Sequence, residues 1–350
     1  MANETLSAPA RVSAAAVPVP LALPGRATAA PHVRRPARFR PRPSRRDRWG
    51  YLFIAPWVIG FLLFTAGPMI ASIALSFTDY DMAAARPVGL GNYADLLWRA
   101  NPVGGHGDPQ LYKSLWNTFY YTAFAVPLGL IGSLLLAVLL NQKLRGLSFF
   151  RTVYYVPSLV PAVASSLLWI WILQPEKGLL NQFLIWLFAQ WPINALHLAP
   201  PAWLQSEAWS KPSLIVMSLW GIGGARMVIF LAGLQGIGEQ YYEAAKIDGA
   251  GPIRTFRHVT LPLITPMIFF NLVLGVIAAS QTFTTAYVMT NGGPNDSTLF
   301  YALYLYQSAF ERLEMGKASA MAWILFTILL VFTLIQFNRS KKWVHYEGEE

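Results

Sequence analysis

The residues best placed to do chemistry lie in a short polar stretch, EAAKIDGAGPIRTFRHVTLP, at 243–262. Long apolar runs flank it on both sides. The stretch carries charges of both signs: Lys246, Arg254 and Arg257 against Glu243 and Asp248. Such a surface suits ionic contacts with a protein partner.

The same stretch predicts two short helices at an angle, an elbow. Gly249 suits the position just after a helix, where a left-handed conformation is needed. Pro252 suits the first turn of the next helix, where its missing N–H costs nothing. Ile253, Phe256 and Val259 follow along one face, which we expect to turn toward the rest of the protein. Two interpretations stay open here: a docking surface for a soluble protein, or an amphipathic linker at the membrane surface.

Several kinds of chemistry are excluded by the sequence. The chain has no cysteine, which rules out disulfides, thiolate zinc sites and cysteine catalysis. It has no G-x-x-x-x-G-K-[ST] phosphate loop, because GKAS at 316–319 lacks the first glycine and the hydroxyl residue. H-E-x-x-H, G-x-S-x-G and clustered histidines are also missing. We therefore expect a non-catalytic protein without a cofactor or a metal.

The elements that must position this stretch are membrane spans. The chain is 55% hydrophobic and 13% charged, with a mean hydropathy of +0.40, whereas an average soluble domain is about 25% charged. Six apolar segments are each long enough to cross a bilayer: 51–77, 114–140, 149–173, 213–236, 263–288 and 318–338. We expect an all-α, multi-pass membrane protein.

The basic residues predict its orientation. The net charge of +10 lies in an arginine-rich N-terminus and beside the apolar segments, which argues against a nucleic-acid partner. The segments on the side of the N-terminus carry more Lys and Arg, so both termini are expected in the cytoplasm. We predict a disordered basic tail at 1–48, a membrane domain at 49–343 and a short cytoplasmic C-terminus at 344–350.

The elbow resembles the EAA signature of the permease subunits of ATP-binding-cassette (ABC) importers. That signature reads E-A-A, three residues, G, nine residues, I, one residue, L-P. This chain keeps the spacing, with Val259 in place of the usual Ile: Glu243, Ala244, Ala245, Gly249, Leu261 and Pro262. Asp248 within IDGA matches the carbohydrate branch of the family. Further matches, such as YVMTNGGPNDST at 287–298, cover nearly everything after residue 50.

The resemblance is to the first permease of maltose- or glycerol-3-phosphate-type importers. It implies a type I importer fold of six transmembrane helices around a methionine-permease-like core, in a bacterial or archaeal inner membrane. It also implies a second homologous permease, a cytoplasmic ATPase dimer, an extracytoplasmic solute-binding protein and a sugar substrate. The alternative is an ion-coupled secondary carrier or a channel, which usually keeps buried carboxylates that these spans lack.

The resemblance further assigns roles to the elbow, residues 239–262. It implies that Glu243 makes an ionic contact with the ATPase, and it includes Asp248 among the residues that couple the permease to the ATPase. The small residues Ala244, Ala245 and Gly249 would allow the ATPase to approach closely and the elbow to bend. The anchor to the helix bundle would be Val259, Leu261 and Pro262.

Polar residues inside the spans are candidates for the substrate pathway. Arg226 interrupts one span, and a guanidinium there usually faces a cavity or a partner. It could contact a sugar hydroxyl or a phosphate, or pair with a carboxylate of the second permease. Four other residues could hydrogen-bond a sugar or else join neighbouring helices: Gln281 and Thr282, flanked by Asn271 and Tyr287.

Overall fold

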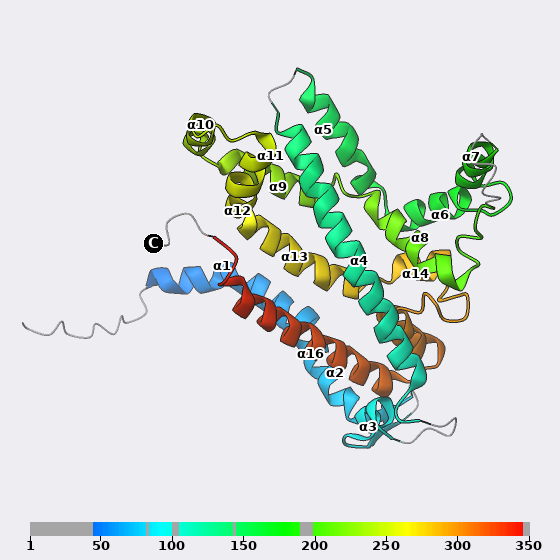
Figure 1. The fold of residues 1–350 in the computed structure, drawn as a ribbon. Coiled ribbons are helices and arrows are strands. Elements are labelled where there is room, and N and C mark those ends of the chain that lie inside the picture. Colours follow the sequence, from blue (N-terminus) through cyan, green and yellow to red (C-terminus); the bar gives the residue numbers. More distant parts are fainter. Residues whose placement is uncertain (1–44, 82–83, 100–104, 143–144, 190–198, 346–350) are drawn as a thin grey trace, which may run out of the picture. The chain divides into compact units, whose positions relative to one another are not determined.

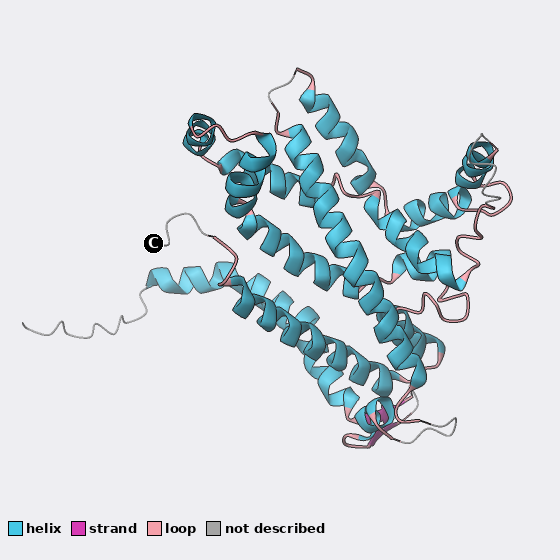
Figure 2. Ribbon diagram, viewed as in Figure 1, coloured by secondary structure: helices cyan, strands magenta, loops and turns pink. Residues whose placement is uncertain are grey.

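The computed structural model describes residues 45–81, 84–99, 105–142, 145–189 and 199–345. It divides into two compact units, Met1–Ile59 and Gly60–Glu350. Most of the predicted tail and of the C-terminal segment 344–350 lies outside the described residues. The described chain is almost wholly helical apart from one two-stranded hairpin (Figures 1 and 2), so the predicted all-α class is confirmed.

The first unit contributes most of α1 (Arg45–Phe61). From Trp49 to Ile59 no side chain is buried, and Phe53 and Trp57 expose 82% and 70% of their surface. The helix that continues from Trp49 to Ser76 is long and apolar enough to cross a membrane. An apolar surface of this extent suits lipid or another membrane subunit.

The second unit begins in that helix and continues with a hairpin and short helices. Its first half contains η1 (Leu62–Ala66), α2 (Gly67–Ser76), β1 (Thr78–Tyr80), β2 (Ala85–Pro87), α3 (Gly91–Leu97), α4 (Pro109–Leu140), α5 (Leu147–Tyr155), η2 (Val156–Leu159), α6 (Ala162–Ile172) and α7 (Leu179–Phe188). The hairpin is antiparallel, with Asp79 opposite Arg86.

The second half is helical throughout its regular elements. It contains α8 (Glu207–Leu219), α9 (Ala225–Gly236), α10 (Glu239–Ile247), α11 (Pro252–Thr255), η4 (Phe256–Thr260), α12 (Leu261–Leu263), α13 (Thr265–Ser280), α14 (Thr284–Met289), α15 (Tyr301–Tyr306), η5 (Gln307–Glu311) and α16 (Met315–Ser340).

Helix α4 is the element around which the second unit packs (Figure 1). Its 32 residues extend over about 48 Å. Asp108 caps its start by accepting hydrogen bonds from the backbone N–H of Gln110 (2.9 Å) and Leu111 (3.4 Å). Helices α8, α9, α13 and α15 all contact it. Buried side chains from Leu111 to Leu140 therefore form one core along nearly its whole length.

The predicted spans are not all continuous helices. Three are: Trp49–Ser76, Pro109–Leu140 and Met315–Ser340. Two more pass the same test only as bent pairs, Leu147–Leu159 with Ala162–Ile172 at 94° and Pro252–Leu263 with Thr265–Ser280 at 64°. The predicted span 213–236 is divided into α8 and α9. Proline and glycine account for two of these interruptions: Pro161 caps α6, and WGIGG separates α8 from α9.

The break between α8 and α9 is tightly packed. A Cβ on Gly223 would lie 2.1 Å from the backbone oxygen of Tyr154, and one on Gly224 would lie 2.8 Å from the Cβ of Ser158. The Ser133 hydroxyl of α4 donates a 2.7 Å hydrogen bond to the Ile222 carbonyl. Non-helical backbone at membrane depth is tolerated only where protein or a water-filled cavity satisfies it, and here α4 and α5 cover it.

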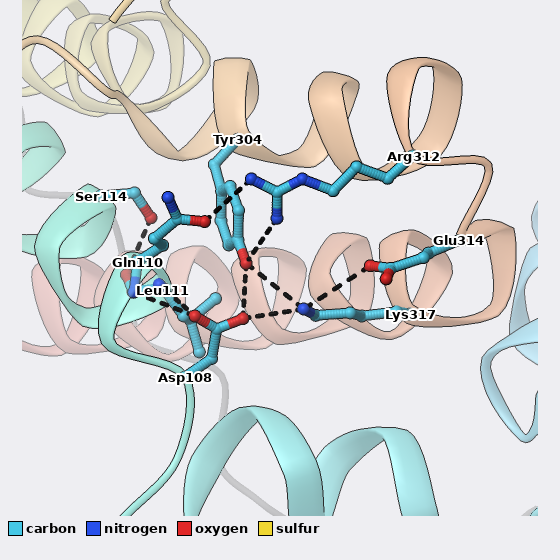
Figure 3. A network of polar contacts seen from close by, with 8 residues as sticks. All are labelled: Asp108, Gln110, Leu111, Ser114, Tyr304, Arg312, Glu314 and Lys317. Atoms are coloured by element: carbon cyan, nitrogen blue, oxygen red, sulfur yellow. Dashed lines mark hydrogen bonds and ion pairs between the residues drawn. The ribbon is translucent and has the colours of Figure 1, made fainter. Parts of the chain in front are cut away.

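A polar network joins the start of α4 to α15 and α16 (Figure 3). The Asp108 carboxylate lies 2.8 Å from the Lys317 ammonium and accepts a 2.5 Å hydrogen bond from the Tyr304 hydroxyl. Arg312 donates to the Gln110 side chain at 2.9 Å. Burial raises the pKa of Asp108, but the hydrogen bonds from Lys317 and Tyr304 lower it more, so the carboxyl titrates below its usual value. The network fastens three segments at one end of α4.

Replacing Gly223 tests the packing of the α8–α9 break. Gly223→Ala forces the Tyr154 backbone to move, which should cost about 1–3 kcal/mol and lower the thermal unfolding temperature of the purified protein. Gly221→Ala is the matched control, because its Cβ would meet nothing closer than 3.9 Å. Equal unfolding temperatures for the two variants would contradict the packing described here.

Replacing Lys317 tests the network. In Lys317→Met the Asp108 carboxylate, whose side chain is 15% exposed, loses its cation, and we expect a loss of about 1–3 kcal/mol in unfolding measurements at pH 7. Adding Asp108→Asn should recover part of this loss, since the amide keeps the helix cap without the charge. Because the folded-state pKa is lowered, the wild-type contribution should persist above about pH 4 and disappear as the pH falls through the folded-state pKa. Wild-type stability in Lys317→Met would overturn the assignment.

Candidate functional site

The first helix of the elbow ends in a hydrogen-bonded turn. Gly249 has φ +70°, and its N–H donates to the Lys246 carbonyl at 3.1 Å. The Ala250 N–H donates to the Ala245 carbonyl at 2.9 Å. This pair of bonds is the Schellman motif, so the predicted role of Gly249 at the end of α10 is confirmed. Figure 1 shows α10 turning away from the helices that follow it.

The second helix of the elbow leads directly into a span. Pro252 occupies its first position, as predicted. The helix then passes through a π-turn, η4, and α12 before bending by 64° into α13. Thr260 is buried, and its hydroxyl lies 3.3 Å from that of Tyr242 on α10. Val259, Leu261 and Pro262 are half-buried, which suits the expected anchor.

One expectation about the elbow is wrong. Ile253 does not face the rest of the protein: 84% of its surface is exposed, whereas Phe256 and Val259 are half-buried. Ile253 lies in the first turn after Gly251, before the helix reaches the bundle. The π-turn at Phe256–Thr260 also adds a residue to the turn. Residues spaced three apart, such as Ile253, Phe256 and Val259, therefore do not all lie on one face of this helix.

The exposed surface of the elbow combines an apolar pair with free charges. Ile247 and Ile253 expose 87% and 84% of their surface. Around them lie exposed Glu243, Asp248 and Arg254, and neither carboxylate forms an ion pair within the described part of the chain. Hollows of about 430 and 500 Å³ flank the elbow. Exposed apolar side chains with an ionic rim are typical of a protein-binding surface.

A small cavity of about 160 Å³ lies between α4, α8, α9 and α13. Arg226, in the first turn of α9, lines it together with Tyr121, Ser218 and Thr282. Gly129 makes room for the guanidinium, because a Cβ on it would lie 2.7 Å from the Nη1 atom. A Cβ on Gly275 would lie 3.5 Å from its Nη2 atom. The cavity therefore has one cation, three hydroxyl groups and small or branched apolar side chains on its wall.

The structure brings only part of the predicted substrate set together. Arg226 and Thr282 share the cavity, whereas exposed Gln281 ends α13 next to it. Asn271 is 2% exposed and donates to the Met267 carbonyl of its own helix at 3.0 Å, so it serves the helix. Tyr287 belongs to a separate aromatic cluster, in which it stacks on Phe283 at 5.2 Å.

Sequence reasoning missed three residues near these sites. Tyr121 and Ser218 line the cavity together with Thr282. Tyr306 joins the aromatic cluster, 4.9 Å from Phe283 and 5.5 Å from Tyr287. A tyrosine within an apolar span was the available signal for Tyr121. Tyr306 lies outside the predicted spans, so the sequence offered no comparable signal for it. Among the described residues no cluster of His, Asp and Glu could bind a metal ion.

Curated proteins with similar sequences are membrane transport subunits. The chain is 42% identical over 314 residues to the probable ABC transporter permease protein YesP of Bacillus subtilis (strain 168), covering 88% of this chain and 96% of that protein. It is 31% identical to the arabinooligosaccharides transport system permease protein AraP of the same organism, over 83% and 88% of the two chains. It is 30% identical to the sn-glycerol-3-phosphate transport system permease protein UgpA of Shigella flexneri, over 87% and 99%.

A solved structure shares the fold. It is a chain of a bacterial alginate ABC transporter in complex with an alginate pentasaccharide-bound periplasmic protein, with a TM-score of 0.71 and 22% identity over 85% of this chain and 95% of that one. Residues 114–343 match the family described as "Binding-protein-dependent transport system inner membrane component". The predicted resemblance is thereby confirmed, and the chain belongs to this family of inner-membrane transport components.

Proposed function

We propose that this chain is the non-catalytic permease subunit of an ABC importer for a carbohydrate. It forms half of the translocation pathway, and a separate cytoplasmic ATPase dimer binds its elbow. The observation that carries the proposal is the exposed surface of the elbow, where Ile247 and Ile253 lie near the exposed carboxylates of Glu243 and Asp248. The chain has no phosphate-binding loop of its own, so this surface is where an energy source can attach.

The elbow is mechanically joined to the candidate pathway. Ile264, at the bend between α12 and α13, is fully buried. From there α13 continues to Ser280, about 24 Å away, where Thr282 lines the cavity. A displacement of the elbow by a closing ATPase dimer is carried by this helix to the pathway. The resulting change between inward- and outward-facing states is a rigid-body switch driven by differential binding.

Both termini are proposed to lie in the cytoplasm, and contacts among the described residues support this for the elbow and the C-terminal segment. The elbow shares a hollow with Asn141 at the end of α4, and Arg151 donates to the Leu140 carbonyl at 2.8 Å. The His345 N–H donates to the Thr265 hydroxyl at 3.0 Å. Segments predicted to be cytoplasmic thus meet at one end of α4, and the start of α4 faces the solute-binding protein.

A carbohydrate substrate agrees with the relatives and with the chemistry of the pathway. Proteins 30–31% identical to this chain are named for transport of arabinooligosaccharides, sn-glycerol-3-phosphate and sulfoquinovosyl glycerol, all rich in hydroxyl groups. Here Gln281 and Thr282 offer hydrogen bonds, and the stacked rings of Phe283 and Tyr287 offer an apolar face beside them. Sugars need both kinds of contact.

Reconstitution tests the proposal as a whole. The chain is purified with the second permease and the ATPase encoded beside it and placed in liposomes with the solute-binding protein. We expect ATP hydrolysis that the loaded binding protein stimulates, and uptake that requires ATP. Uptake of the same solute without any ATPase subunit would instead identify an ion-coupled carrier or a channel.

Glu243→Ala tests the docking role of the elbow. We expect normal membrane insertion but at least about tenfold weaker ATPase binding, since a charged contact at an interface is worth about 1.5–3 kcal/mol. Co-purification of the ATPase and uptake are the measurements. The control is Glu311→Ala, an exposed carboxylate in η5. Normal uptake in Glu243→Ala would count against the docking role.

Gly249→Ala tests whether the bend itself transmits the coupling. A left-handed alanine costs about 1–2 kcal/mol, so the end of α10 should rearrange and ATP-driven uptake should fall severalfold. Nothing lies within 4 Å of the added Cβ, so the effect is one of backbone conformation. Gly251→Ala is matched, because it also meets nothing within 4 Å but has φ −69°. A Gly251→Ala defect as large as that of Gly249→Ala would refute the role of the bend.

A further inference from the structure

We propose that the Arg226 cavity binds the anionic group of an acidic saccharide, a carboxylate or a phosphate, so that the importer selects charged over neutral sugars. The inference rests on the proposed function, because it assigns a substrate class to that pathway. Three observations about Arg226 support it: the position of its guanidinium, the space beside that group, and the lack of a carboxylate near it among the described residues.

The position of Arg226 makes a counter-charge necessary. It faces Gly129, which lies eleven residues before the end of α4 at Leu140, about 16 Å along the helix. That depth is about half the hydrocarbon thickness of a bilayer. A guanidinium so placed is retained only where it meets a partner or a water-filled cavity.

The described part of the chain does not supply that counter-charge. None of the six apolar segments contains Asp or Glu. Across the described residues no ion pair includes Arg226. The other residues that line its cavity are uncharged, and the polar ones among them are Tyr121, Ser218 and Thr282. The anion therefore comes from another molecule.

The surroundings hold the guanidinium facing the cavity. Gly129 of α4 lies against its Nη1 atom, where a Cβ would come within 2.7 Å, and Gly275 of α13 lies beside its Nη2 atom, where a Cβ would be in ordinary contact at 3.5 Å. Arginine suits this role because its planar fork can bind a carboxylate or phosphate through two parallel hydrogen bonds. The Thr282 hydroxyl can add a further donor to the same anion, whereas the Ser218 hydroxyl donates to the Ile215 carbonyl at 2.6 Å.

The size of the cavity fits an acidic group and not a whole oligosaccharide. Its 160 Å³ corresponds to about five water molecules, at roughly 30 Å³ each. A carboxylate or phosphate fits this space. The rest of the sugar extends past exposed Gln281 toward the rings of Phe283 and Tyr287, which follow directly along the chain.

Ligand-induced thermal stabilisation of the assembled complex tests the inference without transport. A ligand that binds only the folded complex raises its unfolding temperature. The probes are matched pairs: cellobiouronate against cellobiose, digalacturonate against its dimethyl ester, and sn-glycerol 3-phosphate against glycerol. We expect at least one acidic member to raise the unfolding temperature more than its neutral counterpart. The responding pair distinguishes a uronate from a phosphate.

Two variants assign that effect to Arg226. Arg226→Gln should weaken half-maximal stabilisation by the acidic probe at least about tenfold, equivalent to 1.4 kcal/mol. Gly129→Ala keeps the charge but displaces Nη1, and it should weaken the same response while leaving any response to the neutral probe unchanged. Gly132→Ala, on the same helix, is the control, because its Cβ would approach only Ile222, at 3.3 Å.

The contrary outcomes are distinct. Equal stabilisation by each acid and its neutral counterpart, or an unchanged acid response in Arg226→Gln, would overturn the inference. Dissociation of the second permease in Arg226→Gln, with no acid effect in the wild type, would overturn it and assign Arg226 to an ion pair between subunits. ATP-dependent uptake of a neutral sugar alone would keep the proposed function and reject only the acidic substrate.

Discussion

Backbone that leaves the helical conformation inside a bilayer must find other hydrogen-bond partners, and in this protein α4 provides them. Its Ser133 hydroxyl donates to the Ile222 carbonyl in the break between α8 and α9 at 2.7 Å. Its Asn117 amide donates to the carbonyls of Asp296 and Leu299 at 2.8 and 3.1 Å. Each unpaired backbone group in lipid would cost several kcal/mol. Because the continuous helix α4 supplies hydrogen bonds to such groups, the neighbouring helices can be interrupted.

The breaks give the bundle an interior that can bind a solute. Where α8 and α13 end, Ser218 and Thr282 turn toward a cavity that a continuous helix pair would fill. The same helix, α13, carries the elbow at its other end. Under the proposed function, an ATPase that moves the elbow acts on the cavity through this one helix, which begins beside the buried Ile264. In that proposal, one helix connects the ATPase-binding surface with the substrate cavity, as a rigid-body switch requires.

The charged groups lie in separate regions along α4. The ionic network around Asp108 and Lys317 lies at one end of α4, and the elbow lies near the other. Between them Arg226 stands apart, on a cavity with hydroxyl groups but no carboxylate. Ion pairs at the end of a span lie close to water, whereas a guanidinium within a span usually faces a partner or a water-filled cavity. This separation is the physical basis for assigning different roles to the two kinds of charge.

The sequence by itself determined the class, the approximate spans and the elbow. Its apolar runs, the spacing around Gly249 and the position of Pro252 depend on local chemistry, which a linear pattern records. Only the tertiary structure decided where spans break, that Ile253 points outward, and that Arg226 meets Tyr121 and Thr282 while Asn271 does not. These outcomes depend on contacts between segments far apart in the chain. Gly129 and Gly223 show why: each is an ordinary glycine in the sequence, and its role comes from the group packed against it.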